Sequence, residues 1–180
     1  MRVLILMIAS LVSAMAYGAV AEGPVFLFPQ VAKYGGIVAV PDAAETPQRG
    51  AKVVFDITAD SKPAEVHKGL EGVARYLNLN AQAGWKPTEV KLALVLHGGA
   101  TKSALNSSAY AKHTGTDTNP NLELIQALRA HGVEVFVCGQ SLARNKYSSS
   151  EVSSDVTVAV SAMTVNVNKQ QAGYAYLSIH

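Results

Sequence analysis

GVEVFVCGQ, residues 132–140, contains the only cysteine of the chain, Cys138. The Val and Phe residues before it predict a short buried strand that ends at Cys138, where Gly139 breaks the strand and a helix-compatible segment begins. In open α/β sheets, ligands and chemistry collect at the carboxyl ends of the strands. A thiol at that point faces the first turn of the next helix, whose unpaired N–H groups favour the thiolate. Cys138 is therefore a candidate functional residue.

The same succession of strand and helix runs from Lys52 to the end of the sequence. Apolar runs predict strands at residues 52–59, 91–99, 133–138, 156–163 and 174–179. Helices are expected from Ser61 and Pro63 to Gly84, over 101–110, from Asn119 and Pro120 to Gly132, and over 163–172. Strands joined by helical connections predict an α/β fold, a three-layer α/β/α domain around a five-stranded, mainly parallel sheet.

Three segments divide the chain. Residues 1–21 combine a cation at Arg2 with an apolar run and small residues, which predicts a secretory signal peptide rather than a membrane span. Cleavage after Ala21 is preferred to cleavage after Ala16. Residues 22–50 are rich in Pro, Gly and Ala and are interpreted as an extended N-terminal arm, and residues 51–180 as the α/β domain. The expected location is periplasmic or secreted.

Charge and cysteine content narrow the function classes. The chain carries 15 cations and 13 acidic side chains, so the exported protein is nearly neutral. Nucleic acid is therefore not expected as a partner, and neither is a membrane once the signal peptide is removed. A single cysteine cannot form an internal disulfide, so the fold must rest on packing alone.

Parallel strands end at the same edge of a sheet, so residues far apart in the sequence converge there. The expected cluster contains Asp60, His97-Gly98-Gly99, Cys138-Gly139-Gln140 and Ser161. We take Cys138 and His97 as catalytic candidates, because a neighbouring imidazole can deprotonate a thiol or hold an anion beside it. We take Gly98, Gly99, Gly139 and Gln140 as binding candidates, because glycine permits a close approach of the backbone to a ligand.

Structural explanations compete with each of these roles. Cys138 can be an inert buried thiol, since free cysteine is among the most buried residue types. His97 can merely cap its strand, and the Gly98-Gly99 pair suits a tight turn. HGGATKS is neither a dinucleotide fingerprint nor a P-loop, no GxSxG elbow is present, and the histidines lack ligand spacing. No metal and no cofactor are predicted.

Four segments together resemble the DsrE/DsrF-like family, in particular its exported branch. These are LALVLHGGATKSALN (92–106), NPNLELIQALRAHGVEVFVCGQSLARNKY (119–147), DVTVAVSAMTVN (155–166) and QQAGYAYLSI (170–179). The similarity spans Lys52 to Ile179. It implies a three-layer α/β/α domain and homo-oligomers, commonly trimers or hexamers. Members of the sulfur-relay branch carry a persulfide on a cysteine, and Cys138 occupies the position where that thiol is expected.

One departure matters, because the relay members act in the cytoplasm whereas this chain is predicted to be exported. Two hypotheses follow. In the first, Cys138 is a thiol or persulfide carrier that meets a sulfur-donor or acceptor protein. In the second, the chain is a non-catalytic homo-oligomeric binding module whose cleft holds a small anion or a peptide. Flavin binding rests on analogy between folds alone.

Overall fold

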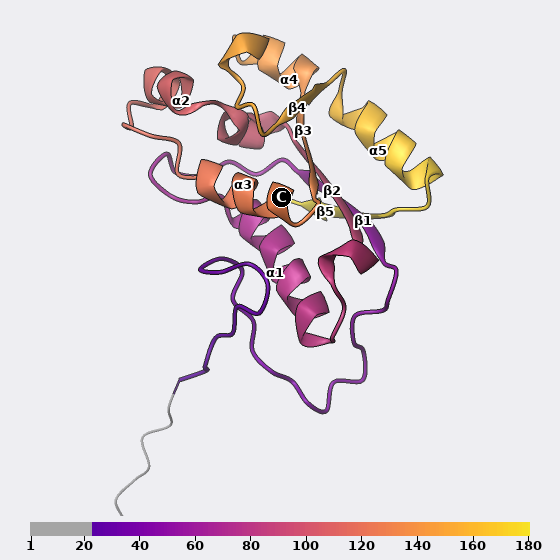
Figure 1. Ribbon diagram of the computed structural model, residues 1–180. Helices are drawn as coiled ribbons and strands as arrows, with labels where there is room; N and C mark the ends of the chain where they lie inside the picture. The colour runs from indigo at the N-terminus through magenta and orange to yellow at the C-terminus, as the bar shows by residue number, and fades with distance from the viewer. Residues whose placement is uncertain (1–22) are drawn as a thin grey trace, which may run out of the picture.

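The computed structural model describes residues 23–180, so the predicted signal peptide, residues 1–21, lies outside the described residues. Five strands form one sheet (Figure 1): β1 (Lys52–Ile57), β2 (Lys91–Leu96), β3 (Glu134–Cys138), β4 (Thr157–Ala159) and β5 (Ala175–Ile179). Every pairing is parallel, and the order across the sheet is β4-β3-β2-β1-β5. The predicted α/β class with a five-stranded sheet is confirmed.

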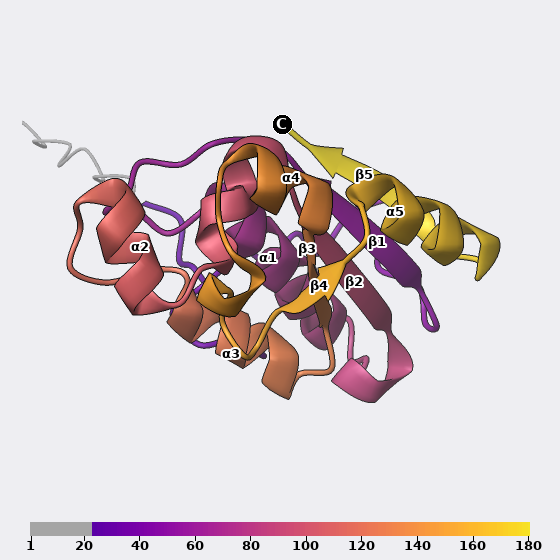
Figure 2. The same cartoon turned by 90° about the horizontal axis from the view of Figure 1, so that it is seen from above.

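Helices cover both faces of the sheet (Figure 2). Helices α1 (Lys68–Gln82) and α3 (Leu122–Ala130) lie on one face, and α5 (Ala162–Gln171) lies on the other. Shorter elements complete the connections: η1 (Pro87–Glu89), η2 (Gly98–Ala104), α2 (Ser107–Thr114), α4 (Gly139–Arg144) and η3 (Ser149–Glu151). None of the helices among residues 23–180 is long and apolar enough to span a bilayer.

The two faces of the sheet are packed unequally. The face under α1 and α3 holds the larger apolar cluster, which includes Leu70, Leu77, Leu94, Leu124 and Val135. The face under α5 holds a smaller one, made of Val54, Ala93, Val95, Cys138, Ala162 and Val165. Because side chains alternate along a strand, every second residue of the central strands belongs to the α5 face.

Helix α1 begins at Lys68, later than the start predicted at Ser61 and Pro63. The ring of His67 replaces the expected cap: its Nδ1 accepts a hydrogen bond from the N–H of Gly69 at 2.9 Å. Its Nε2 donates to the carbonyl oxygen of Ala59 at 2.9 Å. The side chain thus satisfies one of the free N–H groups of the first turn. Histidine is not among the usual cap residues, so the pattern pointed to the wrong start.

The helix predicted over 101–110 is divided in two. The 3-10 helix η2 ends at Ala104, and α2 starts at Ser107. Between them, Leu105 forms an isolated antiparallel bridge with Val152, and Asn106 caps α2 by accepting a hydrogen bond from the N–H of Ala109 at 2.9 Å. An asparagine cap favours a new helix start over continuation of the old helix.

Strand β4 is shorter than the predicted run of residues 156–163. It ends at Ala159, because Ser161 caps α5 by accepting a hydrogen bond from the N–H of Thr164 at 3.0 Å.

Residues 23–50, predicted as an arm, lie against α1. Asn78 of α1 is fully buried and makes four hydrogen bonds to this segment. Its Oδ1 accepts from the N–H groups of Gln30 and Val31 at 2.9 and 2.8 Å, and its Nδ2 donates to the carbonyls of Tyr34 and Gly35 at 2.9 and 3.0 Å. The Asn78 amide therefore anchors residues 30–35, while other contacts, such as the hydrogen bond from Trp85 Nε1 to the carbonyl of Pro47, hold the rest of the segment.

We expect Asn78→Ala to release this segment. The substitution leaves buried N–H and C=O groups without partners, which costs roughly 1–3 kcal/mol of the free energy of unfolding. Limited proteolysis should then cut within residues 23–50 faster than in the parent chain. Asn80→Ala is the matched control, since Asn80 is buried on the same helix but bonds only to the carbonyl of Tyr76. Equal protection of the segment in both variants would contradict the prediction.

Candidate functional site

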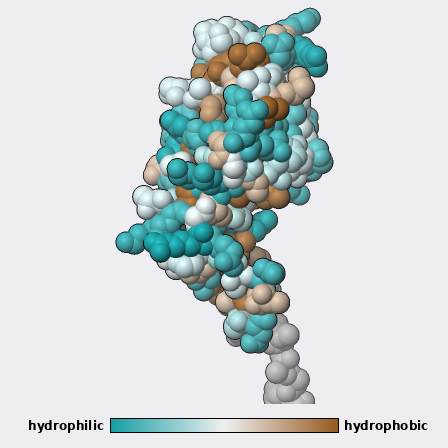
Figure 3. All heavy atoms as spheres, turned by 90° about the vertical axis from the view of Figure 1, so that its right-hand side faces the viewer, coloured by the Kyte–Doolittle hydropathy of each residue, from teal (hydrophilic) through white to brown (hydrophobic). Residues whose placement is uncertain are grey.

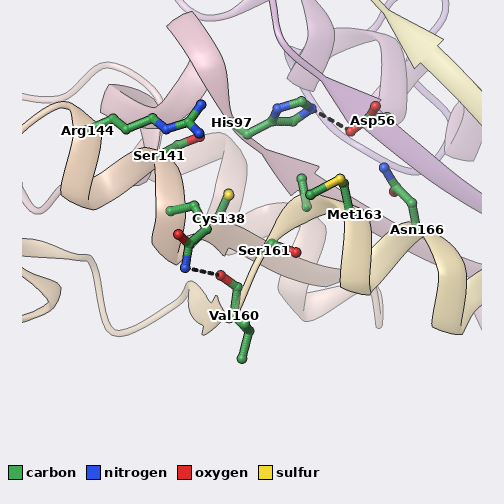
Figure 4. Close-up of a pocket in the computed structure, with 11 residues that line it drawn as sticks. Asp56, His97, Cys138, Ser141, Arg144, Val160, Ser161, Met163 and Asn166 are labelled. Atoms are coloured by element: carbon green, nitrogen blue, oxygen red, sulfur yellow. Dashed lines mark hydrogen bonds and ion pairs between the residues drawn. The ribbon is translucent and has the colours of Figure 1, made fainter.

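A cleft of about 450 Å³ opens at the carboxyl edge of the sheet, on the α5 side. The ends of β1, β2 and β3 form its floor, and the first turns of α4 and α5 form its walls (Figure 4). The residues around it are Asp56, His97, Cys138, Gln140, Ser141, Arg144, Val160, Ser161, Ala162, Met163 and Asn166. Both predicted catalytic residues therefore face one cavity.

Strand register brings His97 and Cys138 together. Leu96 of β2 pairs with Val137 of β3, so the next residues along the two strands, His97 and Cys138, follow at the same level. Both belong to the α5 face, since side chains alternate between faces. Figure 4 shows the imidazole and the sulfur directed into the same space. The convergence predicted from strand order is thus built by backbone pairing.

The thiol of Cys138 lies between the first turns of α4 and α5. Burial opposes the charged form of the thiol and would raise its pKa. Hydrogen bonds from the Ser141 hydroxyl and from the N–H groups of Ala162, Ser141 and Gln140 outweigh this effect, and the pKa of Cys138 therefore lies below the ordinary value. Donors that point at a sulfur stabilise the thiolate. Cys138 is 5% exposed, so the thiolate is sheltered while it still lines the cleft.

His97 is held by a carboxylate that the sequence analysis did not single out. Its Nε2 lies 2.7 Å from Oδ1 of Asp56, the next-to-last residue of β1. The second oxygen of Asp56, Oδ2, accepts a hydrogen bond from the hydroxyl of Tyr176 on β5 at 2.6 Å. The site therefore contains a continuous chain of hydrogen bonds, Tyr176–Asp56–His97, that crosses three neighbouring strands.

Asp56 is a buried anion, only 6% exposed. Burial works against its charge, but hydrogen bonds from Tyr176 and from the Asn166 amide, together with His97, hold the pKa of the carboxyl below its ordinary value. A buried charge is stable only when paired and hydrogen-bonded. Asp56 satisfies both conditions through His97, which follows β2, Tyr176 of β5 and Asn166 of α5.

The remaining predicted residues are placed differently. Gln140 lines the cleft, and its side chain donates to the carbonyl of Val160 at 3.3 Å. Gly139 lies beneath it, where a Cβ would come within 2.9 Å of the carbonyl oxygen of Ala159. Gly98 and Gly99 lie outside the cleft lining.

The two glycines pack on the segment that follows β1. A Cβ at Gly99 would approach Asp60 within 2.8 Å. The N–H of Gly98 donates to the hydroxyl of Ser141 at 3.3 Å, so this residue reaches the thiol through Ser141. Asp60 pairs with Lys102 at 2.6 Å and is not part of the cleft, whereas Ser161 is.

Asp56 and Tyr176 could have been predicted from the alternation of side chains between the two faces of the sheet. Asp56 is the single charged residue inside the apolar part of its strand, two positions after Val54 on the same face. Tyr176 is level with Val54 in the β1–β5 register, so it points to that face as well. Ser141, Arg144 and Asn166 carry no comparable signal, because their positions depend on how α4 and α5 dock.

An exposed apolar rim borders the cleft. Val160, Met163 and Val167, of α5 and the connection before it, are 74%, 75% and 50% exposed. Figure 3 views the α5 side, where brown apolar residues gather at the upper end of an otherwise hydrophilic surface. Within residues 23–180, no group of three or more His, Cys, Asp or Glu side chains is placed to hold a metal ion.

The model of the DsrE/DsrF-like family matches residues 52–179. Among curated proteins, none matches the chain significantly. A solved structure, a protein of unknown function from Methanobacterium thermoautotrophicum (MTH1491), is similar with a TM-score of 0.52 and 19% identity, over 72% of this chain and 99% of that one. That likeness concerns the fold. The family match covers the entire α/β domain, and this chain therefore belongs to the DsrE/DsrF-like family.

Proposed function

We propose that this chain is a thiol-based sulfur carrier in which Cys138 accepts a sulfane sulfur and hands it to an acceptor. One observation carries the proposal: the only thiol of the chain lines an open cleft and has its pKa lowered by hydrogen-bond donors from α4 and α5. The thiolate, not the thiol, is the sulfur nucleophile. Family membership adds support, since the sulfur-relay branch uses a cysteine at this point of the fold.

The proposed chemistry needs no redox cofactor. The thiolate of Cys138 attacks the terminal sulfur of a donor hydropersulfide, R–S–SH, so a new S–S bond forms at Cys138 as the old S–S bond breaks. The electron pair of the broken bond leaves with R–S⁻, which takes up a proton. The persulfide on Cys138 loses its proton and remains as an anion. Transfer to an acceptor thiol is the same exchange in the reverse sense.

The charge around the cleft suits this anion. Arg144, at the end of α4, lines the cleft, and its guanidinium makes no ion pair with any residue in the described range 23–180. Figure 4 shows it beside Ser141, over the thiol side of the cavity. A nearby cation and N-terminal N–H groups both stabilise an anionic sulfur.

A second function is favoured by the burial of the sulfur. At 5% exposure, Cys138 resembles a packed core residue, and it belongs to the apolar cluster under α5. On this reading the chain is a non-catalytic binding module, and the cleft holds a small anion between Arg144, His97 and the first turns of α4 and α5. Reactivity of the native thiol separates the two functions.

The first prediction concerns sulfur loading. Incubation of the native protein with polysulfide should add the mass of one sulfur atom to Cys138, measured by intact mass spectrometry after alkylation. Cys138→Ser should gain no mass. A thiol that resists both polysulfide and iodoacetamide when native, yet reacts after denaturation, would favour the binding module instead.

The second prediction concerns the pKa of the thiol. The Ser141 hydroxyl favours the thiolate, so Ser141→Ala should raise the pKa of Cys138, and the thiolate should appear only at higher pH. The rate of alkylation against pH should therefore shift upward by about half a unit to one unit, the size expected for one hydrogen bond. Ser150→Ala, on η3 and bonded to Ser148, is the control. An unchanged profile would remove Ser141 from the site.

We also propose that the protein works outside the cytoplasm as a homo-oligomer, with a donor or acceptor protein found there. The exposed rim of Val160, Met163 and Val167 supports the oligomer, because exposed apolar surface is commonly covered by a partner.

The third prediction follows from that rim. Sedimentation of the mature protein should give a mass of several chains, and Val167→Asp should lower it, because a charge buried in an interface without a partner is unfavourable. Val40→Asp, at 63% exposure within the N-terminal segment, is the matched control. A single-chain mass for the parent protein would contradict the proposal.

A further inference from the structure

The carboxylate of Asp56 has an unusual counter-ion. Among the residues that the structure describes, its ion pair is made with His97 and with no Lys or Arg side chain. Asp56 is 6% exposed, and the side chain of His97 is 25% exposed. A buried carboxylate is unfavourable unless it is paired and hydrogen-bonded. The Nε2–H of His97 and the hydroxyl of Tyr176 supply the hydrogen bonds that Asp56 needs.

Hydrogen bonds also fix the direction of the ring. The hydroxyl of Tyr176 donates to Oδ2 of Asp56 at 2.6 Å. The other carboxylate oxygen, Oδ1, lies 2.7 Å from Nε2 of His97. The other ring nitrogen, Nδ1, makes no hydrogen bond to any residue of the range 23–180. Figure 4 shows the ring with Nε2 directed at Asp56 and the second nitrogen away from that contact. His97 lines the cleft together with Cys138 and Arg144, so Nδ1 is the ring nitrogen left for a molecule bound there.

We propose that Asp56 and Tyr176 are positioning residues that hold His97 as a proton donor to the thiolate expelled when Cys138 exchanges sulfur. This inference rests on the proposed function of Cys138. It gives His97 a different task from deprotonating the thiol, since the donors that lower the pKa of Cys138 come from α4 and α5.

The step can be written for any donor with an S–S bond. The Cys138 thiolate attacks one sulfur, an S–S bond forms at Cys138, and the donor S–S bond breaks. The electron pair departs as R–S⁻, which takes the Nδ1 proton of His97 and leaves as R–SH. The imidazole becomes neutral and regains its proton from water. An alkyl thiolate is a poor leaving group and gains from this proton, whereas an aromatic thiolate leaves readily without it.

The groups that face His97 are few. Asp56 reaches it from β1, with Tyr176 of β5 behind the carboxylate, Cys138 lies at the end of β3, and Arg144 comes from α4. Helix α5 contributes the neutral side chains of Asn166 and Met163 to the cleft. Removal of the Asp56 charge therefore takes away the acceptor that fixes the ring through Nε2, and leaves Arg144 as the only permanently charged side chain among these groups.

The test compares two neutral disulfides, hydroxyethyl disulfide with an alkyl leaving thiolate and dipyridyl disulfide with an aromatic one. Near neutral pH, Asp56→Asn should slow the reaction of Cys138 with hydroxyethyl disulfide by roughly tenfold or more, the lower range for loss of a general acid. Its reaction with dipyridyl disulfide should stay within about twofold, because that leaving group needs no proton. His97→Gln should reproduce this selectivity.

Tyr176→Phe guards against a folding defect, since Tyr176 is on the edge strand and 42% exposed. It should slow the alkyl reaction by roughly threefold, as one hydrogen bond to the carboxylate is lost, and leave the aromatic reaction unchanged. Tyr174→Phe and Asp155→Asn are the matched controls, because Tyr174 contacts Glu134 and Asp155 contacts Gln126, both away from the cleft.

The outcomes are separable. In Asp56→Asn and Tyr176→Phe, the reactions with the two disulfides could slow by the same factor, or neither reaction could slow. Either result would overturn the proton-donor role while Cys138 remains a reactive thiol. A parent protein whose Cys138 reacts with neither disulfide would overturn the proposed function itself. Slowing that is confined to the alkyl disulfide supports the positioning of His97 by Asp56 and Tyr176.

Discussion

The unequal burial of the two faces of the sheet is the constraint on which the structure depends. Helices α1 and α3 seal one face with the larger apolar cluster, which provides most of the core. The other face, under α5 alone, has a smaller cluster and can hold polar side chains. A domain without disulfides relies on such packing for stability. Stability and chemistry are thus divided between opposite faces of the same strands.

The face of the sheet under α5 carries two groups whose charged forms are stabilised, the Cys138 thiolate and the Asp56 carboxylate, and each is stabilised by different donors. Backbone N–H groups and a hydroxyl favour the Cys138 thiolate, whereas a phenol and an imidazole favour the Asp56 carboxylate. His97 directly follows β2, which lies between β1 and β3 in the sheet order. The imidazole is bonded to the buried acid and lines the same cleft as the thiol.

Sequence patterns predicted the strands and the sheet class because β1, β2 and β3 are apolar runs that are mainly buried, as expected for central parallel strands. The edge strands β4 and β5 are apolar as well, although they are mostly exposed. Sequence patterns also placed Cys138, His97 and Gln140 at one edge, since parallel strands share their carboxyl ends. Asp56 was not recognised because it lies inside a strand, not at its end. Gly98 and Gly99 were predicted to bind a ligand, but they accommodate the neighbouring backbone of the segment after β1. The two uses of glycine cannot be told apart in a sequence, because both require only the absence of a side chain. The start of α1 was misplaced because a histidine ring replaced the usual cap.

The pairing of β5 with β1 joins the first and last strands of the domain and adds Tyr176 to the hydrogen bonds around Asp56. Contacts between segments so distant along the chain are among the slowest to form, because a long loop must close before they contribute stability. A partly folded molecule can therefore hold β1, β2 and β3, and with them the Asp56–His97 pair, before Tyr176 is in place. Completion of the Tyr176–Asp56–His97 chain becomes a late folding event, and a molecule arrested before it lacks the phenol that supports the carboxylate.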